Sequence, residues 1–478
     1  MRRIRARLLL AAVVAATTVA TAGCTSDRDD RDDRNEFRPG AADAGDPYVP
    51  GRGNGGYDVS GYRLRVRYDP ATDRLTGRAT VTATATGNLS RFNLDLIGLD
   101  VSRVTVSGAA ARHRRDGSEL VITPPRGLPR GTAFTVEVDY AGVPTAVPDG
   151  ELGSGGFLHT ADGAIVLGQP ESAATWFPVN DHPSDKATYD VEVTVPDGLA
   201  ALSNGVPGQR SSTGGWTTWR WAERAPMASY LTTLVIGDYR VETGTHGGRP
   251  MVTAVPAGLP ATGPEAASLA RTGEIADFLA SRFGPYPFDS YGGIVVTDSR
   301  IGYALETQSR PVYGPGFFSG GRPNPSVVVH ELAHQWFGNS VSLAKWQDIW
   351  LNEGLATYAE WLWAEHRGTG TAQAAFDRRY AGSSSRLWQT PPAEPGRQNL
   401  FGESVYQRGG MTVHALRVAV GDPAFFKILK TWAAEKRNGN ATTDEFVAVA
   451  ERVSGKQLDK LFAAWLHGTE RPPAPKRL

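Results

Sequence analysis

The stretch HELAHQWFGNSVSLAKWQDIWLNEG, residues 330–354, decides the fold of the second half of this chain. It places His330 and His334 four residues apart, with Glu331 directly after the first histidine, and Glu353 follows after an eighteen-residue gap. Side chains four residues apart lie on one face of a helix, about one turn from each other. The two imidazoles can therefore share a metal ion if the segment is helical.

The residues around this stretch predict two helices. Asn324 is a good N-cap, Pro325 suits the first helical position, and Gly338-Asn339 ends the run. A second helix is predicted to start near Gln347 and to continue to Gly368, and it carries Glu353.

Two imidazoles and one carboxylate, with a water in the fourth position, form the usual ligand set of hydrolytic zinc. We therefore predict one zinc ion held by His330, His334 and Glu353. Glu331 cannot point in the same direction as both histidines, and it is predicted to act as the general base. The alternative is a buried helix with two hydrogen-bonded histidines, and the glutamate that follows at this spacing argues against it.

Working outward, the segment from Tyr57 to about Val241 consists of short β-branched runs with period-two alternation, separated by turn residues. Beyond Pro260 the period lengthens, and residues 265–284 form an amphipathic pattern that stops at Gly284-Pro285. A chain of 478 residues with 40% hydrophobic content can bury more than one core. We expect an N-terminal β domain over residues 57–241 and a catalytic domain over residues 242–478.

Charge and composition favour a small or peptide-like substrate. Fifty basic and fifty acidic residues give a formal net charge of zero, and the densest basic run after the N-terminus is RHRR, residues 112–115. We therefore expect no strong positive electrostatic potential that would attract nucleic acid.

The N-terminus predicts export. Residues 1–24 contain arginines, an apolar run from Leu8 to about Val19 and small residues that end at Cys24, as in a secretory signal. The Ala22-Gly23-Cys24 ending resembles the lipobox of bacterial lipoproteins, although Thr21 departs from the usual leucine. We predict a lipid anchor on Cys24, with plain secretion as the alternative, and an extracytoplasmic protein in either case. Residues 25–56 are predicted to be a disordered tether.

The segments HELAHQWFGN and WLNEGLATY, with VYQRGG and FAAWLHGT further on, resemble the gluzincin aminopeptidases of the aminopeptidase N type, which include the leukotriene hydrolases. The resemblance implies an N-terminal all-β domain followed by a thermolysin-like α/β zinc peptidase domain. Larger members carry a further helical C-terminal domain, and a short form without it is expected because the chain stops at Leu478.

The resemblance also implies roles for single residues. Zinc would lie on His330, His334 and Glu353, Glu331 would be the base, and Tyr406 would donate a hydrogen bond to the tetrahedral oxyanion. Family members have a lysine at the position of Arg408, so the positive charge is the same.

The substrate's free amine is bound in the family by the glutamate of a GAMEN motif, and the matching stretch here is YALET, residues 303–307. Glu306 keeps the carboxylate, whereas the glycine, methionine and asparagine are replaced. Glu171 matches a second amine-binding glutamate, and Gln169 matches a glutamine that lines the pocket for the first side chain.

We therefore expect a zinc aminopeptidase that acts on peptides outside the cytoplasm. The altered GAMEN stretch keeps an endopeptidase of the same fold open. A catalytically retired peptide-binding lipoprotein is a third possibility, but it would need neither Glu331 nor Tyr406. An epoxide hydrolase of the leukotriene type has no separate signal in the sequence.

Overall fold

The computed structural model describes residues 36–148 and 152–475, and Phe37–Leu478 forms one compact unit. The predicted signal sequence with Cys24 and the first part of the predicted tether lie outside the described residues. Within the described ranges, every helix is too short or too polar to cross a membrane.

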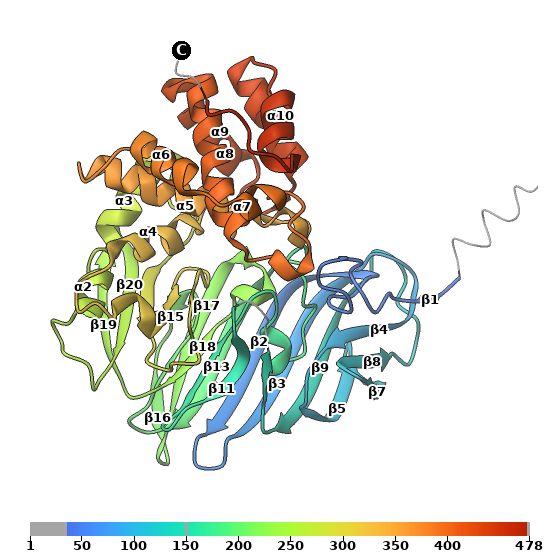
Figure 1. The fold of residues 1–478 in the computed structure, drawn as a ribbon. Helices are drawn as coiled ribbons and strands as arrows, with labels where there is room; N and C mark the ends of the chain where they lie inside the picture. The colour runs from blue at the N-terminus through green and yellow to red at the C-terminus, as the bar shows by residue number, and fades with distance from the viewer. Residues whose placement is uncertain (1–35, 149–151, 476–478) are drawn as a thin grey trace, which may run out of the picture. The chain divides into compact units, whose positions relative to one another are not determined.

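A large antiparallel and parallel sheet dominates the strand-rich half, in the lower part of Figure 1. Its strands follow the spatial order β15 (Val206–Pro207), β17 (Trp216–Met227), β13 (Ala187–Pro196), β2 (Tyr57–Asp69), β3 (Arg74–Ala85), β9 (Ala133–Gly142), β5 (Asp100–Val106) and β6 (Ala109–Ala110), and β16 (Ser211–Thr213) pairs with β17. Along β2, buried and exposed side chains alternate, so the predicted period-two pattern is confirmed.

Two smaller sheets complete the strand-rich half. One contains β1 (Arg38–Pro39), β4 (Leu89–Asp95), β8 (Glu119–Thr123) and β7 (Arg112–Asp116). The other contains β10 (Ala146–Pro148), β11 (Ser154–His159), β12 (Ala164–Leu167), β18 (Leu234–Gly237) and β14 (Ala200–Leu202).

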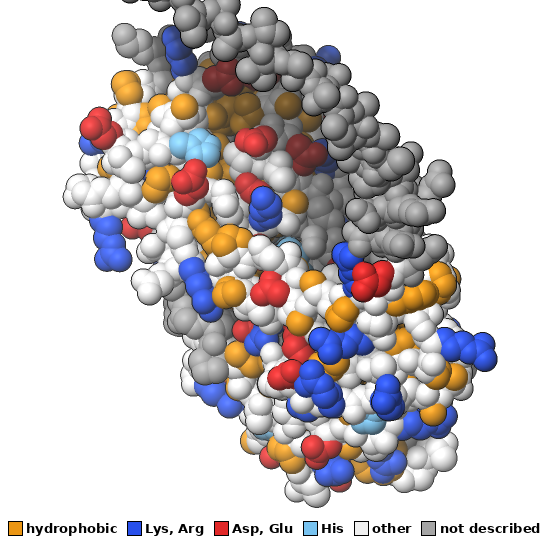
Figure 2. Space-filling view, turned by 90° about the vertical axis from the view of Figure 1, so that its right-hand side faces the viewer, with side chains coloured by type: hydrophobic (Ala, Val, Ile, Leu, Met, Phe, Trp, Pro, Cys, Tyr) orange, Lys and Arg blue, Asp and Glu red, His pale blue; other side chains and the backbone are white. Residues whose placement is uncertain are grey.

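The exposed face of the large sheet carries paired charges. Arg78 on β3 bonds to Asp139 on β9, and Arg224 on β17 pairs with Asp190 on β13 at 2.7 Å. In the strand-rich lower part of Figure 2, basic side chains are interspersed with acidic ones. Such exposed pairs mix both signs on the surface and contribute little stability each.

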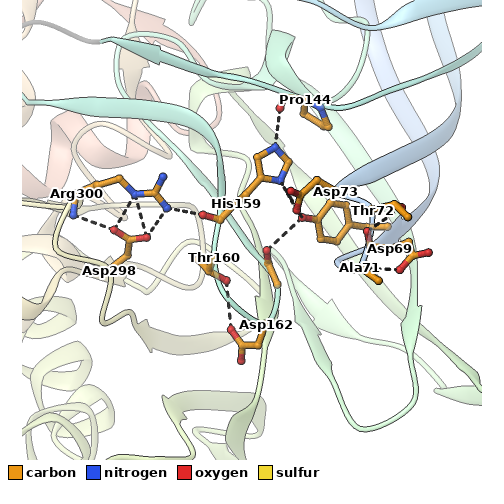
Figure 3. A network of polar contacts seen from close by, with 12 residues as sticks. Asp69, Ala71, Thr72, Asp73, Pro144, His159, Thr160, Asp162, Asp298 and Arg300 are labelled. Atoms are coloured by element: carbon orange, nitrogen blue, oxygen red, sulfur yellow. Dashed lines mark hydrogen bonds and ion pairs between the residues drawn. The ribbon is translucent and has the colours of Figure 1, made fainter.

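A polar network joins the tip of the large sheet to the neighbouring sheet and to the catalytic half (Figure 3). The Tyr68 hydroxyl donates to Asp73 at 3.0 Å and lies 2.9 Å from Nδ1 of His159. Nε2 of His159 lies 2.7 Å from the carbonyl oxygen of Pro144, and Arg300 donates to the His159 carbonyl. Strands β2 and β11 are thereby fixed to each other and to the loop that carries Arg300.

Residues 37–56, which we call the N-terminal strap, differ from the prediction of a disordered tether. Within this segment Val49 is 7% exposed, Asp46 4% and Asn54 6%. The Asp46 carboxylate accepts hydrogen bonds from the backbone N–H of Tyr48 at 2.8 Å and of Trp346 at 2.8 Å. The composition suggested disorder because the segment is polar, but its polar side chains find fixed partners in the folded chain.

The predicted boundary between the N-terminal β domain and the catalytic domain, between residues 241 and 242, stays a prediction.

The catalytic half begins with a mixed sheet in the order β19 (Tyr239–His246), β20 (Arg249–Pro256), β21 (Tyr291–Val295), β23 (Val312–Tyr313) and β22 (Ala304–Leu305). Its helices are α2 (Pro264–Leu269), α3 (Thr272–Phe283), α4 (Pro325–Ala333), α5 (Trp350–His366), α6 (Ala372–Gly382), α7 (Ser385–Gln389), α8 (Gly409–Val420), α9 (Asp422–Glu435), α10 (Thr443–Ser454) and α11 (Asp459–Phe462). In Figure 1, α2 lies beside β20 at mid-height, and α6, α8, α9 and α10 lie in the upper part. The two short strands β24 (Ser342–Leu343) and β25 (Asn440–Ala441) pair with each other in parallel.

The prediction of a single helix over residues 265–284 is wrong in one respect, because the segment forms two helices, α2 and α3. The Ser268 hydroxyl donates to the carbonyl of Pro264 four residues earlier, at 2.6 Å, and accepts from the backbone N–H of Asn324 at 2.9 Å. Such a bond to the preceding turn bends a helix. The predicted end at Gly284 is confirmed, where φ is 102°.

Candidate metal centre and active site

Helix α4 begins as the sequence predicts. The Asn324 side chain caps it by accepting from the backbone N–H of Val327, and Pro325 is the first helical residue. The regular helix ends at Ala333, and His334 is its C-cap. Helix α5 begins at Trp350, slightly later than predicted, because residues Trp346–Asp348 form a 3-10 turn.

The three predicted zinc ligands converge. Oε2 of Glu353 lies 3.2 Å from Nε2 of His330 and 3.4 Å from Nε2 of His334. The three ligand atoms all lie within 4.8 Å of one another. Burial acts against ionisation of Glu353, but the neighbouring His334 and His330 hold the pKa of its carboxyl below the usual value. An ionised carboxylate and two imidazole Nε2 atoms at one point are the donor set that tetrahedral zinc requires.

The other ring nitrogens fix the orientation of both imidazoles. Nδ1 of His330 lies 2.9 Å from Oε1 of Glu360, and Nδ1 of His334 lies 3.1 Å from the carbonyl oxygen of Phe337. With Nδ1–H donated to an oxygen, each Nε2 keeps its lone pair for the metal. The residues present therefore fit one zinc ion.

A cavity of about 290 Å³ opens on this centre. Its walls include the three ligands together with Gln169, Glu306, Glu331, Glu360, Tyr406 and the apolar side chains of Leu152, Phe317 and Val327. Glu331 is 5% exposed, and burial raises the pKa of its carboxyl to about 8 while His330 and His334 act in the opposite direction. A carboxylate oxygen of Glu331 lies within 4.8 Å of a ring nitrogen of His334, where it can take a proton from a water in the cavity.

Glu306 lines the cavity and is 2% exposed. Its Oε1 accepts hydrogen bonds from Nε2 of Gln169 and from the hydroxyl of Tyr230, both at 3.1 Å. Its carbonyl accepts from the Gln335 side chain at 3.1 Å and from that of Asn339 at 2.6 Å. The YALET loop is thus tied to the end of the zinc-binding helix despite its departures from the family pattern.

Tyr406 lies in a π-helical turn, Ser404–Arg408, and its ring stacks at 22° on that of His330 with the ring centres 6.1 Å apart. Helix α5 approaches this turn closely because both facing residues are glycines. A Cβ atom on Gly354 would lie 2.9 Å from the Cα of Gly409. The glycine next to Glu353 therefore allows Tyr406 to reach the cavity.

The structure does not bring Glu171 into the cavity wall. Its carboxylate forms an ion pair with the guanidinium of Arg52 in the N-terminal strap. Of the residues predicted to bind the substrate, the cavity wall contains Glu306, predicted for the amine, and Gln169, predicted for the pocket of the first side chain.

Sequence reasoning missed two residues of the site, Glu360 and Tyr230, and also Arg52, the partner of Glu171. Glu360 had a usable signal, because it follows Glu353 by seven residues and so lies on the same face of α5, two turns later. Tyr230 and Arg52 are far from the motif in sequence, and only the folded chain brings them near it.

Comparisons with known proteins agree with this geometry. Residues 271–465 match the model of the peptidase family M1 domain, and residues 59–231 match that of the peptidase M1 N-terminal domain. The M1 zinc metallopeptidase from Deinococcus radiodurans has 33% identity and a TM-score of 0.82, over 91% of this chain and 99% of that structure. The chain belongs to peptidase family M1.

Two curated relatives of this M1 peptidase are similar over part of their length. Aminopeptidase M1 of Arabidopsis thaliana is 28% identical over 63% of this chain, and aminopeptidase B of Rattus norvegicus is 27% identical over 75% of it. The matched regions make up 36% and 57% of those relatives. The predicted family, the fold of a β-rich domain followed by an α/β catalytic domain, and the single zinc are confirmed.

Proposed function

We propose that this M1 peptidase is an aminopeptidase that removes the first residue from peptides. The observation that carries the proposal is the buried carboxylate of Glu306 beside the metal centre. One of its oxygens lies within 4.8 Å of ligand atoms of Glu331 and His334, in the same cavity. A carboxylate at that place gives the α-ammonium of a peptide a charged partner and limits how far the chain can enter.

The residues have separate parts in the reaction. Zinc, held by His330, His334 and Glu353, would polarise the scissile carbonyl as a Lewis acid. Glu331 takes a proton from the attacking water, whose oxygen forms a bond to the carbonyl carbon. The Tyr406 hydroxyl donates to the oxyanion. Glu331 then gives its proton to the leaving nitrogen as the C–N bond breaks.

Relatives support an exopeptidase. Both curated relatives are named aminopeptidases. A mutant of the Deinococcus radiodurans enzyme has been solved with the substrate Tyr-Ser-Ala, and a two-domain M1 zinc metallopeptidase mutant with free L-arginine. Free amino acids offer an α-amine and an α-carboxylate but no second residue, so a site that holds them fits recognition of a chain end.

The test compares peptides with free and acetylated N-termini. We expect cleavage of the first bond only when the amine is free, and Glu331→Gln should keep zinc while kcat falls at least about a hundredfold. Efficient internal cleavage of the acetylated peptide would show an endopeptidase instead. Zinc and peptide bound without turnover by the unaltered protein would show the retired binding protein.

We also propose that the protein acts outside the cytoplasm, anchored through a lipid on Cys24. The support is the signal-like sequence that ends at Ala22-Gly23-Cys24. Cys24→Ser should move the protein from the membrane pellet to the medium, with unchanged specific activity in extracts. An unmodified mature N-terminus at Gly23 in the unaltered protein would favour plain secretion.

A further inference from the structure

The chain continues to turn after the zinc ligand His334, over residues 335–341, which we call the exit turn. Backbone N–H groups donate to the carbonyl five residues earlier, from Asn339 to His334 at 3.0 Å, from Ser340 to Gln335 at 3.1 Å and from Val341 to Trp336 at 3.1 Å. The carbonyls at the end of such a segment have no partner within it and form the negative end of the helix dipole. The exit turn therefore needs donors from elsewhere in the fold.

A side chain from the strand-rich half supplies these donors. Lys186 directly precedes β13, and its Nζ donates to the carbonyls of Asn339 at 2.8 Å, Ser340 at 3.0 Å and Gly439 at 3.4 Å. Among the described residues the ammonium pairs with no carboxylate. An ammonium has three N–H donors and no acceptor, so each of its hydrogens has a carbonyl to bond. A cation at the last carbonyls of a helix is also electrostatically favourable.

The loop before Lys186 is held in place by the segment around β25. Nδ2 of Asn440 donates to the carbonyl of Pro183 at 2.7 Å and to that of Leu343 at 2.8 Å. The backbone N–H of Ser342 donates to the carbonyl of Gly439 at 3.0 Å. Three segments that are far apart in the sequence therefore meet at the ammonium, and Lys186 reaches the exit turn from a fixed base.

The exit turn orients the imidazole of His334. Nδ1 of His334 lies 3.1 Å from the carbonyl oxygen of Phe337, and the His334 carbonyl accepts from the backbone N–H of Asn339. Nε2 of the same ring faces the carboxylate of Glu353. Site residues must be held within about 0.5 Å of their working geometry. A displaced exit turn would carry the Phe337 carbonyl with it and turn the ring away from the metal.

We propose that Lys186 is a positioning residue for the zinc ligand His334. Its ammonium caps the exit turn, and the turn holds the imidazole in the orientation that the metal requires. The strand-rich half thereby takes part in metal binding through a residue that touches neither the metal ligands nor the cavity wall. The inference goes beyond the proposed function, because it applies to an aminopeptidase and to an endopeptidase alike.

The experiment measures zinc affinity by competition with a chelator, on the full chain. Lys186→Met keeps an unbranched side chain but removes the three donors, and we expect the Kd for zinc to rise about tenfold. Lys186→Arg should recover most of the affinity, because a guanidinium also donates to carbonyls. At saturating zinc, KM should change less than about twofold, and any loss of activity should appear in kcat.

Cobalt substitution gives a readout that general destabilisation does not change. The visible absorption of bound cobalt depends on the geometry of its ligands, so the spectrum should differ between the unaltered protein and Lys186→Met. Lys456→Met is the matched control, because Nζ of Lys456 also donates to a carbonyl near the end of a helix, that of Ala419 in α8. Its zinc affinity and cobalt spectrum should be unchanged. Thermal unfolding shows whether each variant is folded.

The proposal is overturned if Lys186→Met binds zinc as tightly as the unaltered protein, or if Lys456→Met loses as much affinity. A raised KM with unaltered zinc affinity also overturns it, because the ammonium would then act through the bond from Asn339 to the Glu306 carbonyl.

A second variant decides the matter if Lys186→Met does not fold. The Ser342 hydroxyl is another donor to the carbonyl of Asn339, at 2.9 Å, so Ser342→Ala should lower zinc affinity about threefold. Unchanged affinity in Ser342→Ala would then overturn the proposal. Failure of the proposed aminopeptidase function gives a different result, namely internal cleavage of acetylated peptides, and leaves these zinc affinities unaffected.

Discussion

At the scale of single residues, Glu360 shows how a second carboxylate holds a metal ligand. Its Oε1 faces Nδ1 of His330 at 2.9 Å, and its Oε2 accepts from the hydroxyl of Ser326 at 2.6 Å. The serine keeps the carboxylate in place, and the carboxylate keeps the imidazole turned toward Glu353.

We predict that Glu360→Ala lowers zinc affinity about ten- to a hundredfold, because the imidazole loses the acceptor that fixes its orientation and tautomer. Competition with a chelator, followed by zinc content, measures this. Glu435→Ala removes an exposed carboxylate on α9 and should leave zinc affinity unchanged. Equal affinities in the two variants would contradict the role given to Glu360.

Tyr406 is the second prediction at this scale. Tyr406→Phe should keep the ring on His330 but lower kcat about a hundredfold, with a smaller change in KM, because the hydroxyl acts mainly in the transition state. Steady-state kinetics check this split. Tyr380→Phe also removes a hydroxyl, one that donates to the carbonyl of Pro472 at 2.7 Å, and it should leave kcat nearly unaltered. A change confined to KM would make Tyr406 a substrate-binding residue.

At the scale of elements, Arg408 shapes the turn that presents Tyr406. It is completely buried, and its guanidinium donates only to main-chain carbonyls among the described residues. These carbonyls belong to Trp388, Thr390, Ala464, Trp465 and Gly468. One side chain therefore joins the end of α7, the π-helical turn and the segment after α11.

We predict that Arg408→Met lowers the free energy of unfolding by about 3 kcal/mol, because several buried carbonyls lose their donors. Arg408→Lys should recover only part of this, since an ammonium has three donors and no planar fork. Denaturant unfolding gives the values, with Arg386→Met on the exposed side of α7 as control. A loss below about 0.5 kcal/mol for Arg408→Met would show that water replaces the guanidinium.

At the scale of the whole molecule, a buried titratable group on β17 makes the stability depend on pH. Glu223 on β17 is 3% exposed, and its Oε1 accepts from the backbone N–H of Ala225 at 3.1 Å. Burial raises the pKa of its carboxyl from 4.5 to about 7. The folded chain thus binds this proton more tightly than the unfolded chain does.

The sign of the pH effect follows from that difference. The stabilisation of the folded chain by protonated Glu223 is fully present below about pH 4.5 and is lost as the pH rises through about 7. We predict that the free energy of unfolding of the unaltered protein falls by about 2 kcal/mol between pH 5 and 8. Glu223→Gln should not show this loss, since the glutamine does not titrate. Denaturant titrations of both proteins at the two pH values test this. Parallel losses in the two proteins would show that Glu223 does not set this pH dependence.

The sequence predicts features that depend on neighbouring residues better than features that depend on residues far apart in the chain. The zinc ligands, Glu331 and the start of α4 at Asn324 could be read directly, because helical spacing and capping are properties of a few neighbouring residues. The alternation in β2 fixed which face of the strand is buried in the same way. Cys24 and the signal-like segment stay predictions from sequence.

Tertiary structure decided the rest. The order of the strap, the division of α2 from α3 and the different surroundings of Gln169 and Glu171 depend on residues more than fifty positions apart. Composition marks residues 37–56 as polar, but it cannot tell whether Asp46 or Arg52 finds a partner. A polar side chain becomes ordered only when the folded chain supplies a donor or acceptor at the right place, and that placement is a property of the whole fold rather than of any local stretch.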